Sequence, residues 1–146
     1  MEQNRMNEFI QSVLVNSTQM AFVEEADRTL KLLENISEIF RYFNSNLQFV
    51  TLFNELEILN RYIEIQKVRY GERYNFNIIN ENAYKSLYIT HLSVIDFLDG
   101  ILYKHIEQKG IPINFAFEFE NNGEKICMKV QIYSSNYQDY FCKDLI

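Results

Sequence analysis

The spacing of apolar residues first changes about halfway along this chain, and the change limits which folds the chain can adopt. Over residues 8–43 and again over residues 52–70, apolar side chains recur every three or four positions, which is typical of amphipathic helices. Over residues 74–78 they alternate with asparagines, which is typical of a strand with one buried face. The chain is therefore predicted to be α+β, with helices first and a sheet after them.

The first half is predicted to form a helical hairpin. Residues 8–43 contain neither Gly nor Pro, so we expect one long helix or two helices in line. Thr51 is a suitable N-cap for a further helix over residues 52–70, which should pack antiparallel to the first. Such a hairpin covers its apolar face at least cost by pairing with a second copy, which predicts a homodimeric four-helix bundle. The expected interface residues are Phe9, Val13, Met20, Leu30, Leu33, Leu56, Leu59 and Ile63.

The second half is predicted to be a small α/β sandwich. Residues 89–106 return to helical spacing, and residues 113–119 and 126–132 alternate on either side of an Asn122-Gly123 turn. One helix should therefore pack on a small antiparallel sheet, with Phe115, Phe117 and Phe119 in a core or an interface. The predicted domains are a hairpin of residues 1–71 and an α/β domain of residues 72–146.

Composition excludes several classes of function. The net charge is −6 and the Lys and Arg residues are scattered, which argues against a nucleic-acid partner. No apolar run approaches the ~20 residues that span a bilayer, and the N-terminus lacks the apolar core of a signal peptide. A cytoplasmic location is therefore predicted, in which Cys127 and Cys142 are expected to be free, inert thiols.

Residues 51–73, "TLFNELEILNRYIEIQKVRYGER", carry a family resemblance. The stretch resembles the segment that, in LytS/YehU-type sensor histidine kinases, joins the dimerisation hairpin to the ATP-binding domain. The matching residues are Thr51, Leu52, Glu55, Leu56, Tyr62, Ile65, Arg69, Tyr70, Gly71 and Arg73. "ISEIFRYF" at residues 36–43 is similar to a second motif of that family. The resemblance implies a dimerisation hairpin followed by a reduced, degenerate ATP-binding domain.

The same resemblance implies that the chemistry of the family is missing. The acceptor histidine of these kinases stands four residues before an asparagine, which here is Asn16, so its position is taken by Ser12. The Mg²⁺-binding asparagine aligns with Gly100 and its acidic neighbour with Asp99. The glycine-rich boxes expected farther along do not match the remaining residues. The resemblance therefore implies no catalytic residue, no bound cofactor and no metal.

Three other polar residues admit two interpretations each. Asp99 could be a metal ligand, but a lone carboxylate on a helix is more often solvated or engaged in capping. His91 and His105 could be ligands or phosphate acceptors, but without Cys or His neighbours at ligand spacing a structural role is favoured. We expect none of the three to carry chemistry.

The resemblance points to a non-catalytic protein of two-component signalling. Such a protein would form homodimers, bind the receiver domain of a response regulator or a sensor histidine kinase, and modulate phosphotransfer. The expected partner-binding residues are Ser12, Asn16, Val68 and Tyr70. The alternatives are a phosphotransferase similar to the sporulation initiation phosphotransferase B, a divergent ATP-dependent histidine kinase or a fragment of one, and a purely structural helical dimer.

Overall fold

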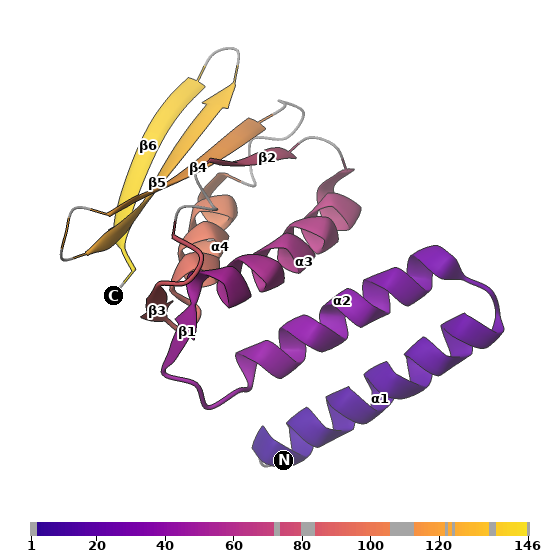
Figure 1. Ribbon diagram of the computed structural model, residues 1–146. Coiled ribbons are helices and arrows are strands. Elements are labelled where there is room, and N and C mark those ends of the chain that lie inside the picture. Colours follow the sequence, from indigo (N-terminus) through magenta and orange to yellow (C-terminus); the bar gives the residue numbers. More distant parts are fainter. Residues whose placement is uncertain are drawn as a thin grey trace. The chain divides into compact units, whose positions relative to one another are not determined.

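The computed structural model of the chain separates into two compact units, Met1–Ser45 and Asn46–Ile146 (Figure 1). It describes residues 3–71, 74–79, 84–105, 113–121, 123, 125–134 and 137–145. In this single chain the helix that begins at Leu52 belongs to the second unit together with the sheet. A dimerisation domain of residues 1–71 remains a prediction.

The first unit is an antiparallel hairpin of two helices, α1 (Gln3–Val23) and α2 (Asp27–Phe43), which pack against each other. The side chain of Asn7, near the start of α1, donates a hydrogen bond of 2.8 Å to Oδ1 of Asn44, just after α2. This contact joins the outer ends of the hairpin and therefore requires the chain to reverse between the helices.

The prediction that residues 8–43 run in line is wrong, because the chain reverses at Glu24–Ala26. Glu25 adopts a φ of 55°, in the left-handed region that commonly ends helices, and the N–H of Ala26 donates back to the carbonyl of Ala21. Glycine usually fills that position, so its absence from the sequence concealed the turn. Within the first unit the hairpin is therefore formed by α1 with α2. The packing of residues 8–43 against residues 52–70 remains a prediction.

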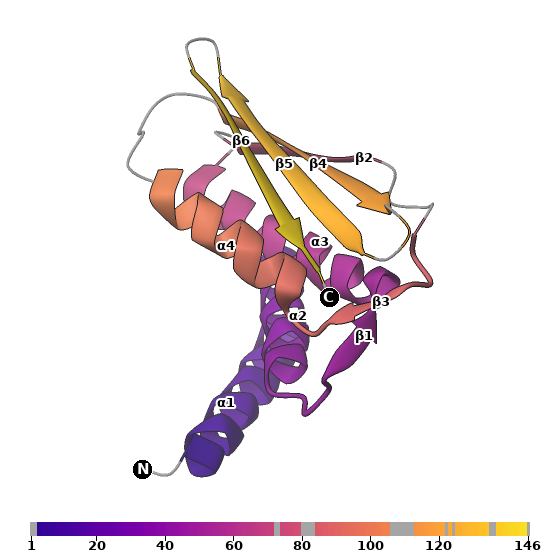
Figure 2. The ribbon, with the colours of Figure 1, turned by 90° about the vertical axis from the view of Figure 1, so that its left-hand side faces the viewer.

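The second unit is a layer of two helices on a four-stranded sheet. Its elements are β1 (Phe49–Thr51), α3 (Leu52–Tyr70), β2 (Tyr74–Ile79), β3 (Tyr88–Thr90), α4 (Ser93–His105), β4 (Ile113–Asn121), β5 (Ile126–Ser134) and β6 (Tyr137–Asp144). The sheet order is β2-β4-β5-β6, and β1 and β3 form a separate antiparallel pair. Figure 2 shows α3 and α4 on the same face of the larger sheet.

Two details of the second unit differ from the sequence-based expectation. β2 pairs with β4 in parallel, so the sheet is mixed and not purely antiparallel. A parallel pair requires a crossover, and α4 lies in the connection between the two strands. Residues 88–90 form a strand where the start of a helix was expected, because β3 pairs with β1, which lies far away in the sequence.

The core follows the predicted alternation. Phe115, Phe117 and Phe119 of β4 are buried, and their partners Ile132, Val130 and Met128 on β5 are buried beside them. This confirms the prediction that the three phenylalanines belong to a core. The apolar face that they form is the one that α3 and α4 cover.

The residues expected in a dimer interface fall into two groups. Phe9, Val13 and Met20 on α1 are exposed, and Leu30 and Leu33 on α2 are half-buried. By contrast, α3 buries its members of the set, Leu56, Leu59 and Ile63, in the single chain. The α1 residues are therefore the ones still available to a second copy.

Cys127 and Cys142 are joined by a disulfide between β5 and β6. The prediction of free thiols is therefore wrong. None of the described helices combines the length and the apolar character needed to cross a membrane.

Candidate functional site

Ser12 and Asn16 lie one helical turn apart on the exposed surface of α1. Together with Glu8, Gln11 and Val15 they line a shallow, open hollow along the helix. Both side chains can donate and accept hydrogen bonds, but neither has the imidazole nitrogen on which a phosphoramidate forms. The two histidines of the chain are His91 and His105, so the first unit has none.

Exposed apolar side chains surround this hollow. Phe9 is 61% exposed and Met20 is 62% exposed, and Val13 and Val15 lie in the open as well. Large apolar residues gathered on one helix in this way are typical of a surface that another protein covers. We refer to Phe9, Ser12, Val13, Val15, Asn16 and Met20 together as the α1 surface.

Val68 and Tyr70, the other expected partner-binding residues, lie at the end of α3 in the second unit. Val68 is 64% exposed, and the ring of Tyr70 is half-buried with the guanidinium carbon of Arg69 4.9 Å from its centroid. Ser12 and Asn16 therefore share one face of α1, whereas Val68 and Tyr70, two positions apart on a helix, point to different sides of α3. A single surface formed by both pairs remains a prediction.

Asp99 accepts a hydrogen bond from the hydroxyl of Tyr62, which links α4 to α3. Burial of the tyrosine, followed by the hydrogen bond to Asp99 and its negative charge, raises the pKa of Tyr62 far above its ordinary value. The hydroxyl therefore keeps its proton and acts as the donor. Asp99 therefore links two helices, a role that differs from both interpretations made from the sequence, a metal ligand and a solvated or capping carboxylate.

Gly100 follows Asp99 on the exposed side of α4. A Cβ atom placed there would meet no heavy atom within 4 Å, so the structure has room for the side chain that the resemblance expects. The asparagine is therefore missing because the sequence has glycine there, and not because the backbone leaves no space for a Cβ atom. In the part of the chain that the structure describes, no three His, Cys, Asp or Glu side chains come together as a metal site would require. Gly100 itself has no side-chain oxygen with which to bind a metal ion.

Glu55 is a polar residue whose role the sequence reasoning missed. Its carboxylate is completely buried on α3 and accepts hydrogen bonds of 3.2 Å from the backbone N–H groups of Leu92 and Val94. Leu92 has a positive φ of 67°, so the chain bends as it enters α4 and presents these N–H groups to the carboxylate. Glu55 therefore caps α4 from a neighbouring helix.

A signal for this role was visible in the sequence. Glu55 is an acidic residue between Leu52 and Leu56 on the apolar face of its helix, and a buried carboxylate needs partners there. The sequence could not show which N–H groups those partners would be.

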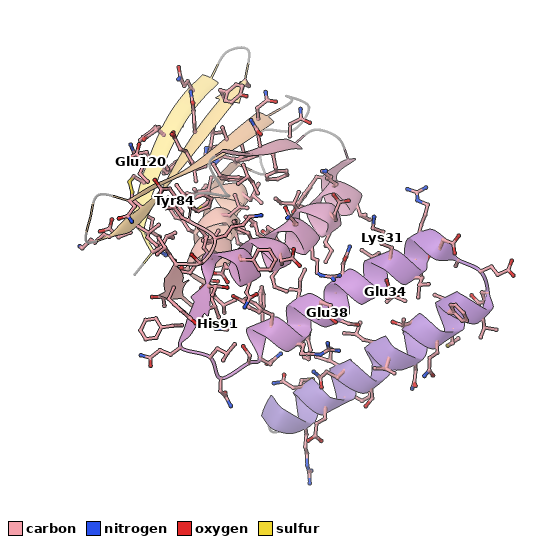
Figure 3. All side chains as sticks on the ribbon, in the orientation of Figure 1. Lys31, Glu34, Glu38, Tyr84, His91 and Glu120 are labelled. Atoms are coloured by element: carbon pink, nitrogen blue, oxygen red, sulfur yellow. A yellow bond between two sulfur atoms is a disulfide. The ribbon has the colours of Figure 1, made fainter. Side chains whose placement is uncertain are left out.

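The two histidines, His91 and His105, belong to the second unit and not to the α1 surface. His105 is buried, with Nδ1 2.7 Å from the carbonyl oxygen of Ile101 and its ring edge-on to Phe141. His91, labelled in Figure 3, donates its backbone N–H to the carbonyl of Gln48 in the segment before β1. The buried ring of His105 agrees with a structural role, whereas the role of the His91 imidazole remains a prediction.

A comparison with protein families places these observations in context. The sequence model described as "Histidine kinase" matches residues 2–74, which is half of the chain. The match begins at the start of α1, continues through α2, β1 and α3, and ends at the first residue of β2. No curated protein matches the chain.

Proposed function

Because this chain belongs to the histidine kinase family, we propose that it is a non-catalytic member of that family. In this proposal it forms homodimers, binds the receiver domain of a response regulator or a sensor histidine kinase, and thereby modulates phosphotransfer. The observation that carries the proposal is Ser12, which occupies the acceptor position on an exposed helix of a unit without histidine.

The second unit supports the same conclusion. The resemblance expects the metal ligand at the position of Gly100. Its acidic neighbour, Asp99, accepts a hydrogen bond from the hydroxyl of Tyr62. A divergent kinase would need other groups to hold the metal and its triphosphate. The described residues offer no cluster of that type.

The exposed α1 surface supports binding. It combines apolar side chains with two small polar ones, Ser12 and Asn16, and it lies on the helix where the resemblance places docking of a receiver domain. Protein interfaces commonly have an apolar centre with polar groups at the rim. A protein that occupies a partner in this way and transfers no phosphoryl group changes the partner's output by mass action.

Binding measurements with two-component proteins test the proposal. Immobilised wild-type chain should capture a receiver domain or a sensor kinase from a purified panel, and Asn16→Arg should weaken that binding at least tenfold. Thr29→Arg, which adds the same charge at an exposed position on α2, is the matched control and should bind like wild type. Equal binding by wild type and Asn16→Arg would move the docking surface elsewhere. Phosphorylation of a captured partner by the chain and ATP alone would overturn the non-catalytic assignment.

A further inference from the structure

The disulfide lies on the face of the sheet that points away from the core. Cys127 stands opposite Asp144, and Cys142 stands opposite Lys129, so the two cysteines are diagonal neighbours on adjacent strands. Their Cα atoms are 6.7 Å apart, inside the range of about 4.4–6.8 Å that disulfides bridge. Among the described strands β6 lies at the edge of the sheet, and the disulfide therefore ties this edge to β5 beside it.

The two sulfur atoms differ in their access to solvent. Cys142 is exposed, whereas only 7% of Cys127 is exposed. A dissolved thiolate can therefore reach the sulfur of Cys142 far more easily than that of Cys127.

Charged residues stand beside both sulfurs. Glu120 on β4 (labelled in Figure 3) and Asp144 on β6 lie across from Cys127, and Lys129 lies across from Cys142. Glu120 is ion-paired with Lys129, and Asp144 is ion-paired with Lys125, so these charges compensate one another. Access to solvent, and not charge, therefore favours attack at Cys142.

We propose that Cys127 and Cys142 form a reversible redox pair that controls how firmly β6 is held on the sheet. A thiolate of a dithiol reductant attacks the sulfur of Cys142, the disulfide breaks, and Cys127 leaves as a thiolate that takes up a proton. The second thiol of the reductant then attacks the mixed disulfide and releases Cys142 as a thiol. Two electrons pass to the protein, and the reductant becomes a cyclic disulfide. An oxidised dithiol reverses both steps.

The position of the pair gives its opening a structural consequence. Just beyond β6, the buried residue Leu145 donates its N–H to the carbonyl of Ile126, and its own carbonyl accepts from the N–H of Thr90. The end of β6 thus holds β5 and β3 together. Opening the disulfide removes the covalent tie beside these hydrogen bonds and leaves the edge strand freer to separate.

Thiol counting and melting of the full chain test the proposal. After treatment with oxidised dithiothreitol, maleimide labelling under denaturing conditions should find no thiol, and after reduced dithiothreitol it should find both cysteines. Reduction should lower the melting temperature of the second unit by at least about 5 °C. It should also speed amide exchange in residues 137–145. The control, Cys127→Ser with Cys142→Ser, should not respond to dithiothreitol.

Single variants test the route of attack. In Cys127→Ser, the remaining Cys142 should react with maleimide in the native protein at least tenfold faster than Cys127 does in Cys142→Ser. Two free thiols after oxidation would overturn the proposal. So would a melting temperature and an exchange rate that reduction leaves unchanged, or equal reactivity of the two single variants.

Discussion

Glu55 is the single residue on which the start of α4 depends most. Each of its two carboxylate oxygens accepts a hydrogen bond from a backbone N–H group, and the side chain is fully buried. Glu55→Ala should lower the free energy of unfolding of the second unit by about 3 kcal/mol, because hydrogen bonds to charged groups contribute about 1.5–3 kcal/mol each. Glu57→Ala, at an exposed position on the same helix, should change it by less than about 0.5 kcal/mol. Urea unfolding of both variants measures the difference, and equal effects would contradict the capping role.

Tyr62 should make the stability of the second unit depend on alkaline pH. Burial and Asp99 raise the pKa of the folded tyrosine above its ordinary value of 10.0, so the folded state holds the proton more tightly than the unfolded state. This stabilisation is fully present below pH 10 and is lost as the pH rises beyond it. Tyr62→Phe should lower the free energy of unfolding of the second unit by about 1 kcal/mol at pH 7. It should also make that free energy fall less steeply above pH 10.

Lys129 provides an internal reference for that experiment. Its hydrogen bond to Glu120 raises the pKa of its ammonium group, and this effect also disappears at high pH. Because wild type and Tyr62→Phe both retain Lys129, the difference between their unfolding free energies across pH 9–11 isolates the tyrosine. Parallel curves would contradict the proposed role of its hydroxyl.

The sequence indicated these positions only in part. Alignment of the resembled motif drew attention to Asp99 and Gly100, but Asp99 meets Tyr62 across 37 residues of sequence, and only the fold brings them together. Glu55 likewise meets its N–H partners through the packing of α3 beside α4. Local patterns cannot identify contacts of this range.

At the scale of the elements, two glycines with different backbone angles give opposite predictions. Gly100 lies inside α4 with open space around it, so Gly100→Ala should raise the free energy of unfolding by about 0.5–1 kcal/mol. Gly71 ends α3 with a φ of 69°, so Gly71→Ala should lower it by about 1 kcal/mol. Thermal melting of the two variants checks both signs, and a stabilising Gly71→Ala would contradict the assigned helix end.

Periodicity predicted the extent of α3 and its Thr51 cap well. The hydroxyl oxygen of Thr51 accepts the N–H of Asn54, and α3 ends at Tyr70, where the apolar spacing ends. The same reasoning missed the reversal at Glu25, because a non-glycine residue occupies the left-handed position. It also missed β3, because a strand of three residues that pairs with distant β1 has too little pattern of its own.

At the scale of the whole molecule, the proposed homodimer makes a prediction that separates its interface from the core. Phe9→Asp with Met20→Asp changes exposed residues of α1, so it should produce monomers that melt like wild type in the second unit. Leu59→Asp places a charge in a fully buried position and should unfold that unit. Sedimentation at micromolar concentration reports the assembly state. A wild-type monomer under these conditions would contradict the dimer.

The general architecture was accessible from the sequence, because the change of period places helices before a sheet. The oligomeric state could not be predicted in the same way, because an apolar helix face can be covered by the same chain or by a second copy. Leu56, Leu59 and Ile63 illustrate the point: they were assigned to a dimer interface, and the single chain already buries them. The family match shows that the chain belongs to the histidine kinase family, while the proposed loss of catalysis rests on the positions that the resemblance assigns to Ser12 and Gly100.

Incubation of the full chain with Mg²⁺ and ATP labelled on its γ-phosphate tests the central claim most directly. Because the resemblance aligns Ser12 with the acceptor histidine and Gly100 with the metal ligand, we predict no incorporated label, either in the chain alone or after addition of a receiver domain that it binds. A catalytically active histidine kinase in the same reaction shows that the conditions support transfer. Acid-labile label on the chain, or label passed from it to the receiver domain, would contradict the assignment of a non-catalytic family member.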